Sequence, residues 1–445
     1  MKLLNFPILF FMALFAPSLY SQEVPEDNVW SLERCIEYAH ENNLVIKQQS
    51  VNAQTAHNQY NQSKAERYPN LNASTGFTTR FGRVRDDTSY ELRDITTRFT
   101  DVNVSSTTPI FEGFTRQNSI ERRKLDWQAA LKDIEQAHHD IALNIASLYM
   151  QILFDKELLE AARRQLDVVE LQVERTKKLV ESGSVPRGNL LEMRSLSASE
   201  VLNVTRLENN LDLSLLDLAH ALDLDDTSNF DIETPQELDM SAADLLQASA
   251  VFDQAVSSMP HIEAAKYRLE GRELDVDIAK GYRYPQLSFN MGWGTSATRY
   301  SGAHRSFSEM LQDNSSSYFG LSLNIPIFNN FNVRTNIDNA RLNVKMSQYQ
   351  LKTEKQNLNK EIQQAYADAK AAYRQYQAGK TAVESYEESF RYTRQKFEVG
   401  MVNPVDYSVA QTEYMNAESE YIQAKYSYIL RVKILDFYQG KPLTL

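Results

Sequence analysis

The stretch Arg67-Tyr68-Pro69-Asn70-Leu71 returns later in the same chain as Arg283-Tyr284-Pro285-Gln286-Leu287. A second stretch, Thr108-Pro109-Ile110-Phe111-Glu112-Gly113-Phe114, returns as Ile325-Pro326-Ile327-Phe328-Asn329-Asn330-Phe331. The two repeats share nearly the same offset, 216 residues for the first and 217 for the second. Self-similarity at a fixed period indicates a repeated structural unit. The chain is therefore predicted to be a tandem duplication in which the same order of elements occurs twice.

A third repeat marks where the longest helices are expected to end. Glu181-Ser182-Gly183-Ser184-Val185 returns as Glu398-Val399-Gly400-Met401-Val402, again at an offset of 217. Proline breaks helix interiors, and each half has one long proline-free interval before these stretches. Glycine is the favoured residue just past a helix C-terminus. We therefore predict long helices over 115–182 and 331–399, followed by return helices over 189–224 and 406–438.

Apolar residues in the long helices recur at alternating steps of three and four. In the first half they are Ile134, Ile141, Ile145, Leu148, Ile152, Leu159, Ala162, Leu166, Val169, Val173 and Val180. Adding 217 gives the second-half set Leu351, Leu358, Ile362, Ala365, Ala369, Tyr376, Gly379, Val383, Tyr386, Phe390 and Phe397. A period of about 3.5 residues predicts a left-handed coiled coil. Each long helix would span about 100 Å at about 1.5 Å per residue.

Four strands are predicted between the repeated motifs, over 70–83, 97–109, 287–298 and 316–327. Apolar side chains alternate with small polar ones, most clearly in the third and fourth strands. This pattern is typical of a membrane barrel with lipid on one side and water on the other. The alternative is an ordinary half-buried sheet. Aromatic residues lie where strand meets helix, where an interfacial belt is expected: Tyr68, Phe111, Phe114, Tyr284, Phe328 and Phe331.

The first residues of the chain have the pattern of a secretory signal peptide. Met1-Lys2 is a short basic region, 3–15 is apolar, and Leu19-Tyr20-Ser21 is a plausible cleavage site. The alternative is an N-terminal membrane anchor, but the apolar run is shorter than the roughly 20 residues of a spanning helix. Residues 1–21 are therefore assigned to a signal peptide.

Composition excludes several other classes. The net charge is −12 and there is no basic stripe, which disfavours nucleic-acid binding. Cys35 is the only cysteine, so no disulfide can form within the chain, and a buried structural thiol is expected. His138 and His139 are adjacent and point to different helix faces, so a shared metal is not expected. No catalytic constellation is found, and we expect neither an enzyme nor a bound cofactor or metal.

The strand count requires an oligomer if the sheet lies in a membrane. Open sheet edges are not tolerated in lipid, and the smallest membrane barrels have about eight strands. A dimer would supply about eight strands, whose interior side chains fill. A trimer would supply twelve and leave a lumen. The trimer is the favoured prediction.

Taken in order, these features resemble the TolC-type outer-membrane efflux and secretion channel family. The segment 30–44, Trp-Ser-Leu-Glu-Arg-Cys-Ile-Glu-Tyr-Ala-His-Glu-Asn-Asn-Leu, is similar to that family's N-terminal helix, and the closing segment 426–443 also fits. The resemblance implies an α+β membrane protein, a homotrimer whose coiled-coil α-helical barrel continues into a 12-stranded transmembrane β-barrel. It divides the chain into a first repeat over 22–224, an equatorial segment over 225–247, a second repeat over 248–438 and a tail over 439–445.

The resemblance also implies location, partners and site residues. The channel would lie in the outer membrane of a Gram-negative bacterium, with its helical tunnel in the periplasm. It would be a passive exit duct for small molecules, driven through a periplasmic adaptor by an inner-membrane transporter of RND or ABC type. The adaptor would dock on the tip turns at Gly183, Ser184, Val185, Gly400, Met401 and Val402.

The periplasmic aperture would be lined by Asp406, with Asn189 as its first-half counterpart. The family has a second acidic residue one helical turn further on, where this chain has Val409, so only one acidic ring is expected. Asp406 could instead be only the N-cap of its helix. A tripartite efflux pump is the favoured function, and a channel for type I protein secretion is the alternative. A secreted coiled-coil structural or adhesion protein would explain the export and the heptads but not the strands.

Overall fold

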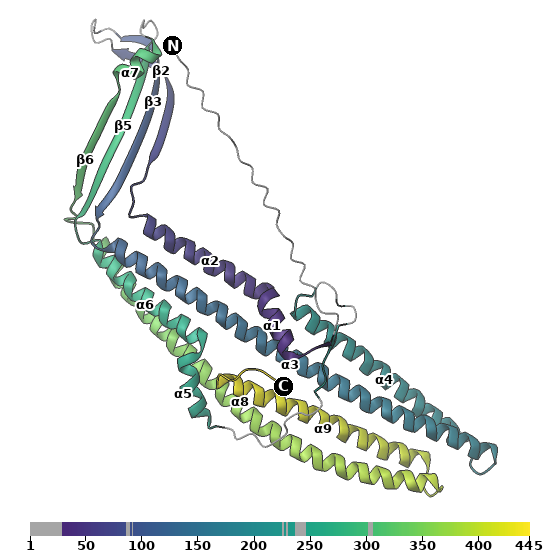
Figure 1. The fold of residues 1–445 in the computed structure, drawn as a ribbon. Helices are drawn as coiled ribbons and strands as arrows, with labels where there is room; N and C mark the ends of the chain where they lie inside the picture. The colour runs from purple at the N-terminus through teal and green to yellow at the C-terminus, as the bar shows by residue number, and fades with distance from the viewer. Residues whose placement is uncertain are drawn as a thin grey trace, which may run out of the picture.

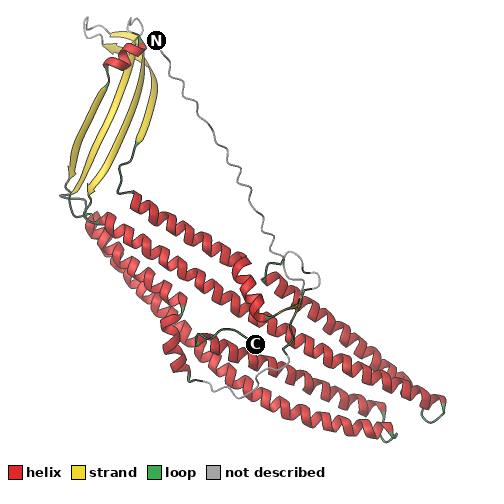
Figure 2. Ribbon diagram, in the orientation of Figure 1, coloured by secondary structure: helices red, strands yellow, loops and turns green. Residues whose placement is uncertain are grey.

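A computed structural model describes residues 29–85, 90, 92–224, 227, 230–235, 246–300 and 306–445. The predicted signal peptide lies outside these residues, as does much of the 225–247 segment. The molecule is elongated, with a sheet at one end and long helices forming the rest (Figure 1). Colouring by secondary structure separates these two parts clearly (Figure 2).

The two halves repeat one order of elements. The first half contains β1 (Val29–Trp30), α1 (Leu32–Asn42), α2 (Leu44–Ala65), β2 (Asn72–Arg85), β3 (Leu92–Phe111), α3 (Thr115–Glu181) and α4 (Arg187–Ala221). After β4 (Asp231–Ile232), the second half contains α5 (Ala248–Ser258), α6 (Pro260–Gly281), β5 (Gln286–Tyr300), α7 (Phe307–Asp313), β6 (Ser316–Asn324), α8 (Asn332–Glu398) and α9 (Pro404–Tyr438).

Two strand boundaries differ from the prediction for reasons of backbone chemistry. β6 ends at Asn324 rather than at 327, because Pro326 has no N–H for a sheet hydrogen bond. β3 extends from Leu92 past Pro109, outside the predicted 97–109. The register shifts between Pro109 and Phe111, and such a bulge accommodates a proline within a strand.

The four long strands form one antiparallel sheet in the order β2-β3-β5-β6. The halves of the chain meet at its centre, where Val104 of β3 is opposite Trp293 of β5. Among the described residues, no further strand pairs with β2 or with β6. The sheet therefore has two open edges.

A strained turn joins strand to helix in the same way in both halves. Gly113 and Phe114 have φ of 61° and 64°, and Asn330 and Phe331 have φ of 51° and 60°. This left-handed region favours glycine and tolerates asparagine. A Cβ on Gly113 would lie 2.2 Å from the carbonyl oxygen of Gly281, so this position also requires the absence of a side chain. The turn fixes the direction in which α3 and α8 leave the sheet.

The coiled-coil seams of the long helices are confirmed. Side chains along the predicted seams are buried, as in Ile145, Ile152, Leu159, Ala162 and Val169 of α3 and Leu358, Ile362, Ala365, Ala369, Tyr376 and Phe390 of α8. Tyr386 is an exception, because 42% of its surface is exposed. Away from the sheet, α3 packs on α4 and α8 packs on α9; nearer the sheet, α3 packs on α2 and α6, and α6 packs on α8.

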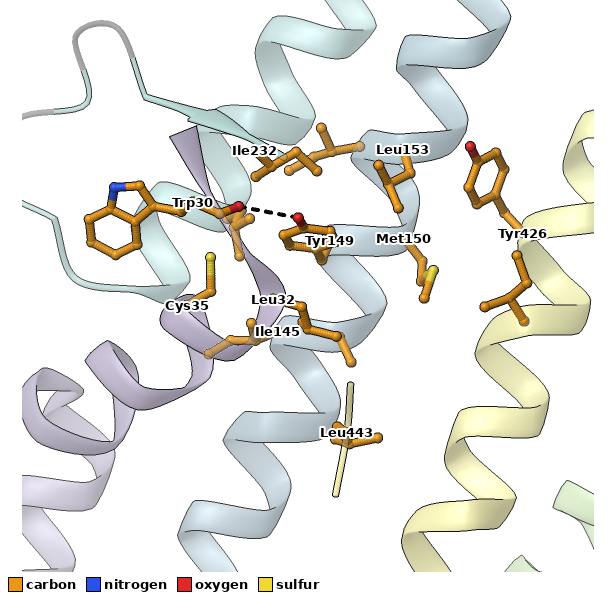
Figure 3. Packing of buried hydrophobic residues seen from close by; sticks show 14 of the residues in the cluster. Trp30, Leu32, Cys35, Ile145, Tyr149, Met150, Leu153, Ile232, Tyr426 and Leu443 are labelled. Carbon is orange, nitrogen blue, oxygen red and sulfur yellow. Dashed lines mark hydrogen bonds between the residues drawn. The ribbon is translucent and has the colours of Figure 1, made fainter. Parts of the chain in front are cut away.

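The largest core lies midway along the helices, where distant parts of the chain meet (Figure 3). β1 pairs in parallel with β4, and the Tyr149 hydroxyl donates to the carbonyl oxygens of Trp30 and Glu233 at 3.2 and 2.8 Å. Leu443 of the C-terminal tail packs into the same cluster. Cys35 is fully buried there, as expected, and burial raises the pKa of its thiol to about 12.

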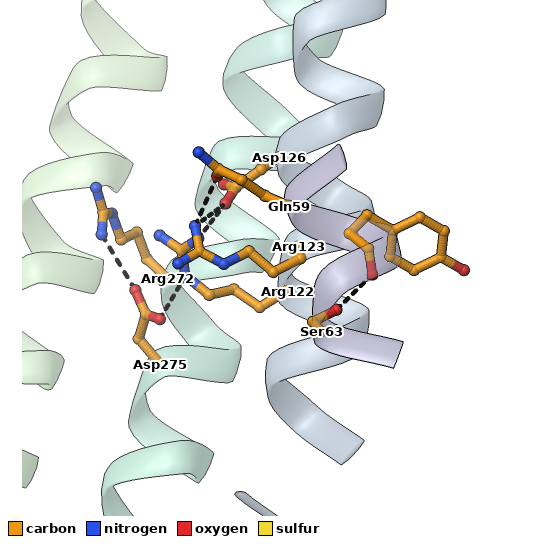
Figure 4. Close-up of polar contacts among 8 residues, drawn as sticks. Gln59, Ser63, Arg122, Arg123, Asp126, Arg272 and Asp275 are labelled. Carbon is orange, nitrogen blue, oxygen red and sulfur yellow. Dashed lines mark hydrogen bonds and ion pairs between the residues drawn. The ribbon is translucent and has the colours of Figure 1, made fainter. Parts of the chain in front are cut away.

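Between this core and the sheet, charged contacts join α2, α3 and α6 (Figure 4). Arg122 Nε donates to Asp275 at 2.6 Å, and a second guanidinium nitrogen pairs with Asp126. Arg272 also pairs with Asp275, at 3.1 Å. The Arg122–Asp275 ion pair therefore joins the two halves of the chain here.

Candidate channel wall and periplasmic aperture

The tip turns have the same hydrogen bonds in both halves. The N–H of Ser184 donates to Leu179 O at 2.8 Å, and the N–H of Gly183 donates to Val180 O at 3.0 Å. In the second half Met401 donates to Lys396 O at 2.8 Å and Gly400 to Phe397 O at 3.1 Å. These are Schellman motifs, and Gly183 and Gly400 have φ of 75° and 78°. The predicted glycine C′ positions are confirmed.

The tips present an exposed surface at the end of the helices. Gly183, Ser184, Gly400 and Met401 are exposed, while Val185 and Val402 are half-buried. No side chain blocks the space next to either glycine, because a Cβ there would meet no atom within 4 Å. The six predicted docking residues thus form two similar turns, side by side at the far end of the molecule (Figure 1).

Asp406 is not the N-cap of its helix, contrary to one interpretation of the sequence, and Asn189 is not the N-cap of α4. α9 begins at Pro404, and its N-cap is Asn403, whose side chain accepts from the N–H of Asp406 at 2.8 Å. α4 begins at Arg187 after Pro186, which has no side-chain cap. Pro404 lies in the first turn of α9, where the missing N–H of proline costs nothing. Pro186 is instead the N-cap of α4. Each helix begins two residues before the predicted start.

The Asp406 carboxylate is free of the capping role. It lies in the first turn of α9 and is exposed, and it has no ion-pair partner among the described residues. A negative charge in the first helical turn is stabilised by the helix dipole. Asn189, at the equivalent position of α4, is half-buried. The two tips therefore differ in charge at the same place.

Above the tips lies a buried polar contact that the sequence did not reveal. Gln411 of α9 donates to Glu200 of α4 at 3.1 Å, and both side chains are buried. Burial raises the pKa of the Glu200 carboxyl. Tyr407 is fully buried close by, and burial raises its pKa to about 12. Glu200 lies on the same buried seam of α4 as Leu190, Met193, Val204 and Leu207. A carboxylate at a seam position is the sequence feature that indicates this buried contact.

Ion pairs and hydrogen bonds link the first helix pair to the second along its length. Glu157 of α3 accepts from Lys425 at 2.7 Å and from the Tyr426 hydroxyl at 2.6 Å, both in α9. Closer to the tips, Arg164 pairs with Glu418 at 3.5 Å, and Arg175 pairs with Glu398 at 3.4 Å. These polar contacts join the two pairs in addition to the apolar clusters that they share.

The sheet has one apolar and one polar face. Paired residues share a face, and the apolar face carries large exposed side chains: Phe77, Met291, Trp293, Phe319, Leu321 and Leu323. The opposite face is mostly small and polar, and it also carries the rings of Phe99 and Tyr318. On it, Asn103 donates to Asp101 at 2.7 Å, and a Cβ on Gly76 or Gly294 would lie 2.5 Å from the side chain of Asp101 or Asn103.

The six predicted belt aromatics lie at the boundary between sheet and helices. All are exposed, from 37% for Phe111 to 73% for Tyr68. The rings of Phe111 and Phe114 meet edge to face at 5.4 Å, and those of Phe328 and Phe331 do so at 5.6 Å. The duplicated turn therefore presents a pair of rings in each half.

A cavity of about 550 Å³ lies beside the central core, between α1, α3 and the C-terminal tail. The rings of His40 and His138 meet there edge to face at 4.4 Å. Burial lowers the pKa of His138, and the neighbouring imidazoles of His40 and His139 lower it further. No group of three or more metal-ligating side chains occurs in the part of the chain that the structure describes.

The apolar sheet face, the long helices and the exposed tips together define a class, the protomer of an outer-membrane channel. Among the described residues, no helix is both long and apolar enough to span a membrane. The model of the outer membrane efflux protein family matches residues 35–223 and 251–440. The chain belongs to this family, and it is the outer-membrane component of an efflux pump of a Gram-negative bacterium.

Individual relatives are similar at low identity over most of the chain. The solvent efflux pump outer membrane protein SrpC of Pseudomonas putida is 22% identical over 397 residues, 86% of this chain and 79% of SrpC. The outer membrane channel CmeC of Campylobacter jejuni superposes with a TM-score of 0.76 at 17% identity, covering 93% of this chain and 86% of CmeC. The outer membrane protein VceC of Vibrio cholerae superposes with a TM-score of 0.73 at 16% identity, covering 93% of this chain and 96% of VceC. The fold predicted from the duplication is confirmed.

Proposed function

We propose that three copies of this chain form a closed duct through which small molecules leave the cell, with no chemistry performed on them. The polar face of the sheet would line a 12-stranded barrel, and the helices would continue it as a periplasmic tunnel. An inner-membrane transporter of RND or ABC type would supply the energy through a periplasmic adaptor.

The observation that carries the proposal is that one protomer has free edges in both layers. In the sheet, the free edges are β2 and β6. In the helical layer, α2 and α4 both pack on α3 at one edge, and α8 lies at the other edge, where it packs on α6 and α9. Large apolar side chains are exposed on α4 and α8: Leu191, Val201, Leu202 and Leu213, and Leu342, Met346, Tyr349 and Tyr386. Copies packed edge to edge would cover these side chains.

Strand number favours three copies. Edges are not tolerated in lipid, so the ring must close, and two copies would give an interior of about eight strands that side chains fill. Glycines and polar side chains line much of the inner face, together with the rings of Phe99 and Tyr318. Three copies give a lumen that water and small solutes can pass.

The adaptor is expected at the tip turns, Gly183 to Val185 and Gly400 to Val402. Two similar turns per chain would give the ring six sites of one shape, which suits a partner that repeats around it. The belt aromatics are expected at the periplasmic lipid interface, because they are exposed at the inner end of the apolar sheet face.

The aperture is expected at Asp406. Three exposed carboxylates around a constriction would favour cations by focusing the field. Asp406→Asn should lower the cation preference of single channels in planar bilayers. Asn189→Asp, the matched change at the other tip, should raise it. Unchanged ion selectivity in both variants would reject Asp406 as the aperture residue.

The oligomer itself has a direct test. The mature chain, extracted from outer membranes in detergent, should have the mass of a trimer by light scattering and conduct in a bilayer. Recovery as a soluble extracellular rod, or a non-conducting dimer, would overturn the proposed function.

A further inference from the structure

One row of the sheet carries two arginines directly opposite each other. In the antiparallel register, Thr79 is opposite Arg98, and Arg98 is opposite Arg299. Facing side chains in such a pair have Cβ atoms about 5 Å apart, and like charges there are destabilising. Both arginines are exposed, and within the described residues neither has an ion-pair partner. The row has an excess of positive charge that no described residue neutralises.

Another arginine on the same face of the sheet is neutralised by an aspartate. Two rows further from the helices, Arg83 is opposite Asp94, and their side chains are 3.2 Å apart. Asp94 lies four residues from Arg98 along β3, about 13 Å at the rise of a strand. It is therefore too far to pair with Arg98 while it holds Arg83. The unpaired row is a specific feature and not a general excess of arginine.

The row lies near the outer end of the apolar face, and the exposed ring of Phe81 lies one row beyond it. Paired rows on this face run from Leu287, opposite Leu323, through Trp293, opposite Val104, to Ala297, opposite Thr100. That band is about 25 Å tall if the strands are tilted by the usual amount, which matches a hydrocarbon layer. Ala297, at its outer end, is buried where α7 packs on β5. Arg98 and Arg299 come one row later, about 5 Å beyond the band. They are placed at the depth of the lipid headgroups.

We propose that Arg98 and Arg299 bind the phosphate groups of lipids in the outer leaflet. The proposal rests on the proposed function, because it needs this face to be in contact with lipid. Guanidinium groups bind phosphate oxygens through two parallel hydrogen bonds, so one phosphate between the two side chains would satisfy both. A free phosphate would gain the same charge contacts, but only a lipid phosphate also places acyl chains on the apolar band below.

The test uses the purified full-length mature channel in detergent and vesicles of phosphatidylcholine with or without bisphosphorylated lipid A. The native channel should partition preferentially into the vesicles with lipid A. The double variant Arg98→Gln/Arg299→Gln should lose about a hundredfold of that preference, since each of the two lost charge-assisted contacts costs about a factor of ten. Arg83→Gln, the neutralised arginine of the same face, should change it by less than twofold.

Two further arms keep the result decisive. Arg98→Lys/Arg299→Lys keeps the charge and should retain part of the preference, which separates lipid binding from misfolding. Inorganic phosphate at millimolar concentration should not compete. An unchanged preference in the Gln double variant, or full competition by inorganic phosphate, would overturn the proposal. If the native protein forms no channel in a bilayer, the proposed function fails; if the Gln double variant conducts normally and still prefers lipid A, only this inference fails.

Discussion

The two helix pairs have the same dimensions but different seams. α3 and α8 each span 67 residues, and α4 and α9 each span 35. The α3–α4 seam is aliphatic, with Leu159, Ala162, Val204 and Leu207 packed together. The α8–α9 seam is aromatic, with the rings of Tyr376 and Tyr428 stacked at 6.0 Å and those of Phe390 and Tyr414 at 5.7 Å. The heptad repeat determines which positions are buried, but aliphatic and aromatic side chains can both occupy them.

Equivalent positions show what accompanies the change. At an offset of 217, Ala162 corresponds to Gly379, and Glu200 corresponds to Ala417. A Cβ on Gly379 would lie 3.4 Å from the Cα of Tyr421, so the aromatic pair approaches closely at this point. The buried carboxylate Glu200 belongs to the aliphatic pair alone. The first pair thus has the buried charge, and the second has the stacked rings and the charged tip.

The largest effect is expected where all four helices meet. Phe390 packs with Val169, Met193 and Tyr407, one from each of the other helices. Phe390→Ala should destabilise the tunnel by about 3–5 kcal/mol, the usual cost of removing a buried ring. Both tip turns should then become sensitive to limited proteolysis. Leu159→Ala, which lies in the aliphatic seam, should expose only the Gly183 turn; equal cleavage of both turns would contradict this comparison.

A smaller effect is expected from the contacts that join the two pairs. Glu157→Gln weakens a partly buried ion pair with Lys425 and changes the acceptor for Tyr426. It should cost about 1–3 kcal/mol, read as a lower thermal midpoint of the helical circular dichroism signal. Arg163→Gln, whose exposed partner Glu208 lies within the first pair, should cost less than about 1 kcal/mol. If the two variants melt alike, the polar contacts between pairs do not hold them together.

Glu200 should make the stability of the first pair depend on pH. Burial raises the pKa of its carboxyl above the ordinary 4.5, so the folded protein binds the proton more tightly than the unfolded chain. Its contribution is fully present below pH 4.5 and is lost as the pH rises through the raised pKa. The thermal midpoint should therefore fall over this window relative to that of Glu200→Gln. If the difference in thermal midpoint between the native protein and Glu200→Gln does not change with pH, Glu200 is not the group that causes the pH dependence.

The smallest effect comes from exchanging the small residues of the two seams. Gly379→Ala should stabilise by about 0.5–1 kcal/mol, because alanine is the better helix former and its Cβ reaches only van der Waals contact. Ala162→Gly should destabilise by about the same amount or slightly more. Thermal melting measures both. If Gly379→Ala lowers the thermal midpoint instead, α8 and α9 cannot move apart at Tyr421 enough to accommodate the added methyl group.

The elements that were predicted well are those with long patterns. The seam residues from Ile145 to Val169 repeat often enough for periodicity to identify their buried face. The glycine ends of α3 and α8 follow from the left-handed conformation that Gly183 and Gly400 adopt. The duplication reinforced both predictions, because each pattern occurred twice.

The elements that were missed depend on few residues or on distant contacts. β1 and β4 have two residues each and are held by a parallel pairing across the chain. The N-cap of α9 is Asn403 rather than Asp406, and the sequence signal for it is a single asparagine followed by Pro404. The Glu200–Gln411 contact joins residues 211 positions apart, and no local pattern reports it.

The two open edges of the sheet also have a consequence for assembly. A chain that has crossed the inner membrane carries unpaired β2 and β6 edges, and a pair of chains still has one edge of each kind. Only closure of the ring removes both, so every intermediate is prone to unwanted strand pairing. Ring formation therefore competes kinetically with aggregation. A co-expressed chain with a proline in the middle of β2 would still pair through its β6 edge but would prevent closure of the ring. Such a chain would inactivate the assemblies that it enters together with intact copies.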